Sequence, residues 1–191
     1  MKKSIITMLV ALVLVAAVGV GATLAYLSDK TGTVTNTFTV GKVKIDLTEF
    51  KDGVELADGQ TGFSYEKVIP GQTYSKEPVV TVKANSEDCY LFVEVVNANT
   101  SIELQNSALN ANGGWTALEN VANVYYRTVD KTAADKAFTL FDSVKIADDV
   151  TELSTFTDIT IKAYAVQKAG FADAAAAWAE ASKVAPAPVQ E

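Results

Sequence analysis

The chain has 191 residues, a formal net charge of −7, no histidine and a single cysteine, Cys89. Without histidine, the chain has no Ser–His–Asp triad, Cys–His dyad or His-ligated zinc site, and one cysteine excludes an internal disulfide. The acidic balance argues against nucleic acid or anionic lipid as a partner, because both bind surfaces rich in Lys and Arg.

The N-terminus has the pattern of a signal peptide. Two lysines supply a positive start, and residues 5–27 carry no charge. This apolar run ends in small residues, with Thr23 at −3 and Ala25 at −1 of an A-x-A-like cleavage site. We therefore expect a signal peptidase to recognise Thr23, Ala25 and Tyr26 and to cleave between Ala25 and Tyr26.

An uncleaved membrane anchor is the alternative, because the apolar run is long enough to span a bilayer. In either case the rest of the chain works outside the cytoplasmic membrane. We expect an N-terminal signal helix over residues 1–25, a β-sandwich domain over 26–184 and a flexible, Pro-punctuated tail over 185–191. Cleavage leaves 166 residues with 14 basic and 23 acidic side chains, a net charge of −9.

After residue 31 the sequence consists of short runs rich in Val, Thr, Ile, Phe and Tyr, separated by Gly, Pro and Asn. Alternation with a period of two predicts strands with one buried face. Seven to nine such strands without helical crossovers predict an all-β fold, an antiparallel jelly roll or β-sandwich. The expected strands are residues 33–40, 42–50, 78–84, 89–97, 100–104, 123–129, 137–146 and 155–167.

The apolar run at residues 89–97 is the strongest core strand. Its odd-numbered residues, beginning with Cys89, form one face, and Tyr90 and Phe92 lie on the other. We interpret Cys89 as a small buried core residue, with a reactive or intermolecular thiol as the alternative. Residues 51–62 are polar and contain Gly, which predicts a loop.

Residues 170–183 are rich in alanine and poor in branched residues, so they predict a C-terminal helix. Its expected apolar stripe is Phe171, Ala175, Trp178 and Ser182. Trp178 and Trp115 are both interpreted as packing residues, although exposed indoles could also stack on a sugar.

Carboxylates occur near each other at Glu87-Asp88, at Asp148-Asp149 and at Asp46 and Glu49. Adjacent acids point to opposite faces of a strand and are usually solvated in loops. Calcium binding and glycosidase-type catalysis remain alternatives, because both need convergent carboxylates. We predict no catalytic residue, no metal ligand and no cofactor, and therefore a protein that is not an enzyme.

Two segments resemble the TasA/camelysin (CalY-like) family of exported proteins, whose signal peptide is processed by the dedicated signal peptidase SipW. They are GATLAYLSD (21–29) and NTFTVGKVKIDLTE (36–49), and residues 69–95 and 140–171 look like later strands of the family. The positions that match the family pattern are Ala25, Tyr26, Leu27, Ser28, Asp29, Phe38, Val40 and Gly41.

The resemblance implies a secreted jelly-roll subunit of extracellular fibres in a bacterial biofilm matrix or on the cell surface. In that family the segment freed by cleavage is a donor strand that completes the sheet of the next subunit. The implied partners are a second copy of the chain in a head-to-tail homopolymer, a SipW-like signal peptidase and a minor matrix subunit. Residues carried over as donor-strand contacts are Tyr26, Leu27, Thr33, Val34, Phe38 and Val40.

The physical properties of residues 26–40 are compatible with this role, because an extended β-prone segment can pair with an exposed sheet edge. The alternative is that these residues fold back as the first strand of their own domain. Two other functions stay open: a membrane-anchored monomeric binding protein of the cell surface and, more remotely, an exported hydrolase. Camelysin-like members have been classed as metalloproteases, but this chain has no histidine, so that label is not carried over.

Overall fold

The computed structural model describes residues 43–151, 156–184 and 186, which all belong to one compact unit of the chain. In these residues there are eleven strands, one 3-10 helix (Ala111–Gly113) and one α-helix, α2 (Ala174–Ala181). Every strand pairing is antiparallel. The described chain is therefore all-β with a short C-terminal helix, as the sequence predicts.

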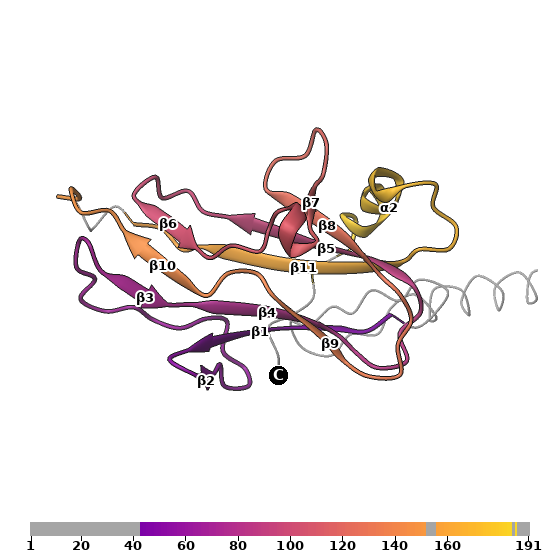
Figure 1. Ribbon diagram of the computed structural model, residues 1–191, viewed down its shortest axis with the longest axis horizontal. Coiled ribbons are helices and arrows are strands. Elements are labelled where there is room, and N and C mark those ends of the chain that lie inside the picture. The colour runs from indigo at the N-terminus through magenta and orange to yellow at the C-terminus, as the bar shows by residue number, and fades with distance from the viewer. Residues whose placement is uncertain (1–42, 152–155, 185, 187–191) are drawn as a thin grey trace, which may run out of the picture. The chain divides into compact units, whose positions relative to one another are not determined.

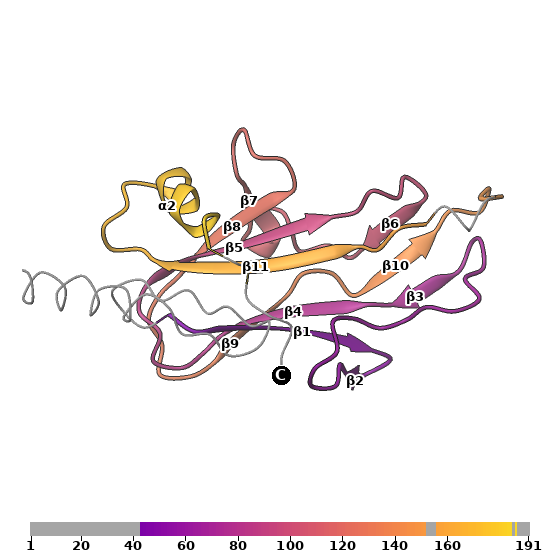
Figure 2. The same ribbon diagram turned by 180° about the vertical axis from the view of Figure 1, so that it is seen from behind.

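The strands form three sheets (Figures 1 and 2), with the orders β2-β1-β4-β9, β11-β5-β8-β7 and β3-β10-β6. The bounds in the first sheet are β1 Ile45–Lys51, β2 Val54–Glu55, β4 Glu77–Val82 and β9 Lys136–Thr139. Those in the second are β5 Cys89–Val96, β7 Thr116–Ala117, β8 Val124–Val129 and β11 Thr160–Gln167. Those in the third are β3 Thr73–Ser75, β6 Ile102–Gln105 and β10 Ser143–Ile146.

The first two sheets face each other as two layers, and the third lies at one end of them (Figure 1). The main core lies between the layers and takes buried side chains from both of them. Leu47 and Val80 come from the first sheet, and Leu91, Val93 and Ala163 come from the second. Leu91 and Val93 lie on the face of the 89–97 strand that period-two patterning assigned to the core.

Strand β5 lies in the centre of its sheet and pairs with β11 and β8. Its odd-numbered residues enter the main core, whereas Tyr90 and Phe92 face outward into a second cluster, as predicted. Cys89 is fully buried, and burial raises the pKa of its thiol to about 12. A buried thiol that stays protonated is a core residue, which confirms the interpretation of Cys89.

The helix α2 covers the outer face of the second sheet, and Asp173 caps it by accepting a hydrogen bond from the Ala176 N–H (2.8 Å). Trp178 packs against Phe92 and Tyr164, with ring centroids 5.3 and 5.2 Å apart. Its packing role is thus confirmed, but the predicted stripe is wrong, because Ala175 and Ser182 are exposed. Small side chains instead let the helix lie close to the aromatic rings, and the buried residues are Ala174, Ala177 and Ala181.

Two expected strands differ from the observed ones. The predicted strand 137–146 is divided into β9 and β10, because the chain passes from the first sheet to the third at residues 140–142. Leu140 and Phe141 are both fully buried there, which a continuous strand with one buried face does not allow. The predicted strand 155–167 begins only at Thr160.

Residues 43–151, 156–184 and 186 contain no helix with the length and apolar content needed to cross a bilayer.

Candidate functional site

The most distinctive surface feature is the side of the molecule where β1 and β11 end their sheets. Strand β11 is the last strand of its sheet among the described residues. Strand β1 is followed outward only by the two-residue β2, which pairs with Phe50 and Lys51. Within the described chain, most of β1 therefore has no strand neighbour on the side opposite β4.

The strand geometry shows which backbone N–H and C=O groups of β1 point away from β4. The Glu49 carbonyl accepts a hydrogen bond from the Leu56 N–H (2.8 Å) on the β2 side of β1. Because backbone groups alternate along a strand, those of Leu47 and Ile45 point to the same side. No described strand reaches them there.

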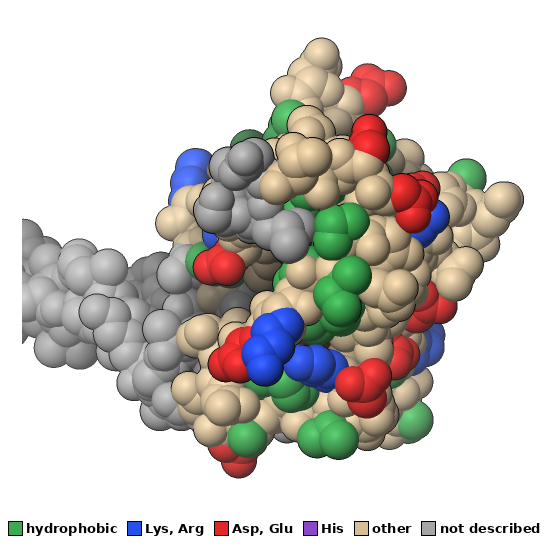
Figure 3. Space-filling view, turned by 90° about the vertical axis from the view of Figure 1, so that its left-hand side faces the viewer, with side chains coloured by type: hydrophobic (Ala, Val, Ile, Leu, Met, Phe, Trp, Pro, Cys, Tyr) green, Lys and Arg blue, Asp and Glu red, His purple; other side chains and the backbone are tan. Residues whose placement is uncertain are grey.

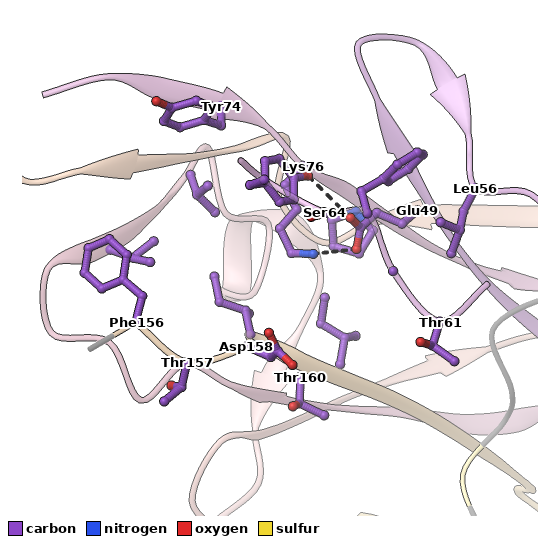
Figure 4. A pocket seen from close by; sticks show the side chains of 18 of the residues that line it. Glu49, Leu56, Thr61, Ser64, Tyr74, Lys76, Phe156, Thr157, Asp158 and Thr160 are labelled. Atoms are coloured by element: carbon purple, nitrogen blue, oxygen red, sulfur yellow. Dashed lines mark hydrogen bonds and ion pairs between the residues drawn. The ribbon is translucent and has the colours of Figure 1, made fainter. Parts of the chain in front are cut away.

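A pocket of about 630 Å³ opens at this side, between the two layers and next to the third sheet. Its lining combines apolar and polar side chains. Figure 4 shows Glu49 and Lys76 on one side of the pocket and Phe156, Asp158 and Thr160 on another. The apolar lining residues are Leu47, Leu56, Phe63, Val68, Pro78, Ile102, Val144, Ile146, Phe156, Ile159 and Ile161.

The pocket contains a buried ion pair. Lys76 Nζ lies 2.5 Å from Glu49 Oε2, and each side chain is only 10% exposed. The Tyr65 hydroxyl lies 2.8 Å from the Ser75 carbonyl oxygen and 3.4 Å from Glu49 Oε1, so its proton can serve either acceptor. Burial and the neighbouring Glu49 charge raise the pKa of Tyr65, which keeps the phenol protonated.

The segment that carries Tyr65 is held against β1 by Lys51. The Lys51 ammonium lies 4.3 Å from the centroid of the Tyr65 ring and donates a hydrogen bond to the Ser64 carbonyl (2.9 Å). Asp52 and Gly53 form the preceding turn, both with positive φ (52° and 78°), as a two-residue hairpin requires. The prediction of a loop over residues 51–62 was thus wrong for β2, and the Asp-Gly pair was the signal that could have found it.

The prediction of solvated carboxylates was wrong for Glu49, since its side chain lies in the pocket and binds Lys76. Glu87 does pair with an exposed lysine, Lys131 (2.7 Å), and Asp46 pairs with Lys83 (2.8 Å). No group of three His, Cys, Asp or Glu side chains in the described part of the chain could hold a metal ion.

Two carboxylates from distant segments, Glu49 and Asp158, line the same pocket. Such convergence is what a glycosidase needs, provided that both groups are free to act on a substrate. Glu49 is instead engaged by Lys76 and approached by the Tyr65 hydroxyl. This arrangement favours a structural or binding role for Glu49 over general acid–base work.

Every residue predicted to act in processing or assembly lies outside the described residues. These are Thr23, Ala25, Tyr26, Leu27, Thr33, Val34, Phe38 and Val40. What the structure adds is a surface that sequence reasoning did not locate, built by residues from β1, from the loop before β3 and from the segment before β11.

The end of the molecule next to the third sheet carries a short row of exposed hydrophobic side chains, with acidic and basic side chains beside it (Figure 3). Ile69, which is 56% exposed, is one of the two most exposed large hydrophobic residues described.

Neither a scan against protein-family models nor a search of curated proteins gives a match to this chain.

Proposed function

We propose that this chain is a secreted structural protein, a jelly-roll subunit that assembles head to tail into extracellular matrix fibres. In this proposal the segment 26–40 of one subunit is the donor strand, and the side of the next subunit between β1 and β11 is the acceptor. The resemblance of residues 21–29 and 36–49 to the TasA/camelysin family supports the donor, and the open side supports the acceptor.

The observation that carries the proposal is that, among the described residues, an unpaired strand edge lies beside a pocket between the layers. A free edge offers main-chain hydrogen bonds, and the 630 Å³ pocket beside it offers room for apolar side chains. An inserted strand uses both, because its backbone pairs with the edge while alternate side chains enter the pocket. A contact of this kind between different surfaces does not close on itself and so gives a filament.

The mature N-terminus has the length and attachment that this role needs. Residues 26–42 precede the first described residue, Val43, which leads directly into β1. Seventeen extended residues span about 55 Å, more than the pocket and the edge of β1 require. The same segment could fold back onto its own edge, so the test has to separate the two arrangements.

The test compares the exported chain with a variant that lacks residues 26–35. We expect the complete chain to form fibres that sediment and are visible by electron microscopy, and the deletion variant to remain a folded monomer. A variant that lacks residues 185–191 is the matched control and should assemble normally. Fibres formed by the deletion variant would contradict the proposal.

A second measurement uses the deletion variant as a chain terminator. It lacks residues 26–35, two thirds of the donor strand, but keeps the acceptor, so it should bind one end of a growing fibre and stop growth. Substoichiometric addition to the complete chain is therefore expected to shorten the fibres. Unchanged fibre lengths would contradict growth through this acceptor. A complete chain that forms no fibres would instead favour the membrane-anchored monomeric binding protein, in which the pocket serves a ligand and the N-terminus folds within one subunit.

A further inference from the structure

The inward-facing row of β1 changes character along the acceptor side. Val43, Ile45 and Leu47 are apolar and buried in the main core, and the next residue of the same row is Glu49. The charge of Glu49 is balanced within the pocket by Lys76 alone among the described side chains. A strand that lies beside β1 therefore meets an apolar stretch followed by one polar position.

The hydrogen bonds to described residues leave part of the capacity of this polar position unused. A carboxylate offers about four lone-pair sites, and the Glu49 carboxylate contacts Lys76 and the Tyr65 hydroxyl. The Lys76 ammonium has three donors, and Glu49 is its only hydrogen-bond acceptor within the described chain. The pair can therefore accept one more hydrogen bond and donate one more to a group that enters the pocket.

The proposed donor strand has a matching pattern. With a period of two, one face of residues 31–40 consists entirely of threonine, which suits solvent. The other face reads Gly32, Val34, Asn36, Phe38 and Val40. Asn36 is the one polar side chain on that face, so an otherwise apolar row again carries a single polar position.

We propose that Asn36 of the donor strand binds the Glu49–Lys76 pair of the acceptor subunit and thereby sets the register of the inserted strand. This inference rests on the proposed donor-strand assembly. The Asn36 side chain has both groups that the pair needs, because its NH₂ donates to the Glu49 carboxylate and its carbonyl oxygen accepts from Lys76. Val34 and Phe38 then enter the apolar parts of the pocket on either side.

Other registers separate the polar groups. A shift of two residues would place Asn36 against apolar lining and Val34 or Phe38 against the ion pair, which leaves buried polar groups unpaired. A fold-back through a two-residue turn at Gly41-Lys42 has the same defect. It would pair Val40 with Val43 and hence Asn36 with Leu47, so a hairpin through this turn does not bring Asn36 to Glu49.

The test mixes two full-length variants, one changed at the donor residue Asn36 and the other changed at the acceptor pair Glu49–Lys76. Asn36→Val places an apolar side chain against the ion pair, and the double variant Glu49→Met with Lys76→Met places Asn36 against an apolar pocket. Alone, each should need about tenfold more protein to form fibres, the effect of one unpaired buried polar group. An equimolar mixture should assemble like the wild type, because alternating subunits make only matched junctions.

Thr35→Val is the matched control, since it changes the neighbouring residue on the solvent face and should leave assembly unchanged. A mixture that assembles no better than its two components would overturn the inference, as would unimpaired assembly of Asn36→Val. These results leave the proposed function intact as long as deletion of residues 26–35 still abolishes fibres. Fibres from that deletion variant, or a wild-type chain that stays monomeric, would overturn both.

A second test leaves the acceptor residues unchanged. Its result therefore does not depend on whether the Glu49→Met, Lys76→Met variant folds normally. Val34→Asn combined with Asn36→Val moves the polar side chain by two residues along the donor. If Asn36 sets the register, the strand shifts by two residues and the subunit repeat of the fibre changes by about 6–7 Å. A repeat identical to that of the wild type would overturn the inference.

Discussion

The fold has two long sides where its facing sheets end, one at β9 and β7 and the other at β1 and β11, and their side chains differ in kind. At the first side the chain fills the gap itself. Trp115 is 1% exposed and meets Phe138 of β9 edge to face, with ring centroids 6.4 Å apart. The turn at residues 111–114 delivers this indole, which joins the two layers.

Arg127 of β8 completes the filling of that side. Its guanidinium lies 3.9 Å from the centroid of the Phe138 ring and 5.3 Å from that of Trp115, and it donates a hydrogen bond to the Gly113 carbonyl (3.3 Å). Burial lowers the pKa of Arg127. None of the ion pairs among the described residues includes Arg127. Its guanidinium stacks on aromatic rings instead of pairing with a carboxylate.

The side at β1 and β11 has a pocket in the corresponding place, and its buried charges pair with each other instead of stacking on rings. This chain can therefore close a side of the fold with its own aromatic side chains. The described residues leave the opposite side open, and we propose that a strand from another subunit fills it. Variants on each side can test whether the two differ as described.

The largest effect is expected for Trp115→Ala on the filled side. Removing a fully buried indole leaves a cavity between the layers, which should lower the free energy of unfolding by about 4 kcal/mol. Urea unfolding measures this change. Ile69→Ala, at an exposed position, is the control and should stay within about 0.5 kcal/mol of the wild type. Equal effects of the two would mean that Trp115 does not hold the layers together.

Lys76→Met should have the next largest effect, on the open side. It leaves the Glu49 carboxylate buried without its cation, which should cost about 3 kcal/mol of unfolding free energy. The double variant with Glu49→Met should regain most of that loss, because an apolar pair of similar volume can pack against the apolar side chains that line the pocket. Lys83→Met breaks partly exposed pairs with Asp46 and Asp135 and should cost less than about 1 kcal/mol.

A smaller effect is expected for Arg127→Met. The substitution keeps a long side chain over Phe138 but removes the charge that stacks on the rings, which should cost about 1 kcal/mol. Because no carboxylate is involved, the loss should be the same at low and high salt, unlike that of an exposed ion pair. A strong salt dependence in urea unfolding would contradict the stacking account.

The strands that sequence reasoning predicted correctly are those with one buried face. β5 shows this best, since its two faces could be read directly from the alternation of Leu91 and Val93 with Tyr90 and Phe92. The break between β9 and β10 could not be found in this way, because Leu140 and Phe141 are both apolar and read as a continuous strand.

The candidate site was harder to predict for a different reason. Its ion pair joins residues 27 positions apart in the sequence, and Asp158 comes from a third segment, so no local pattern contains them together. Glu49 continues the buried row of β1, yet a charge in such a row usually marks the solvent face. Only the packing of the two layers shows that Lys76 reaches the same space.

The smallest expected effect concerns the pH dependence of Tyr65. Burial first, and then the Glu49 charge, raise its pKa above the ordinary value of about 10. As the pH rises above about 10, the unfolded chain loses this proton first, so the folded state becomes less stable. Below that pH both states keep the proton and Tyr65 adds no pH dependence.

Tyr65→Phe should therefore flatten the alkaline loss of stability. Because Tyr65 is partly exposed, the difference between wild type and variant should grow by only about 0.5–1 kcal/mol from pH 10 to 11 in urea unfolding. Some loss remains in the variant, since burial also raises the pKa of Tyr164 and of Cys89. Parallel curves for wild type and Tyr65→Phe would show that the Tyr65 phenol is not held beside Glu49.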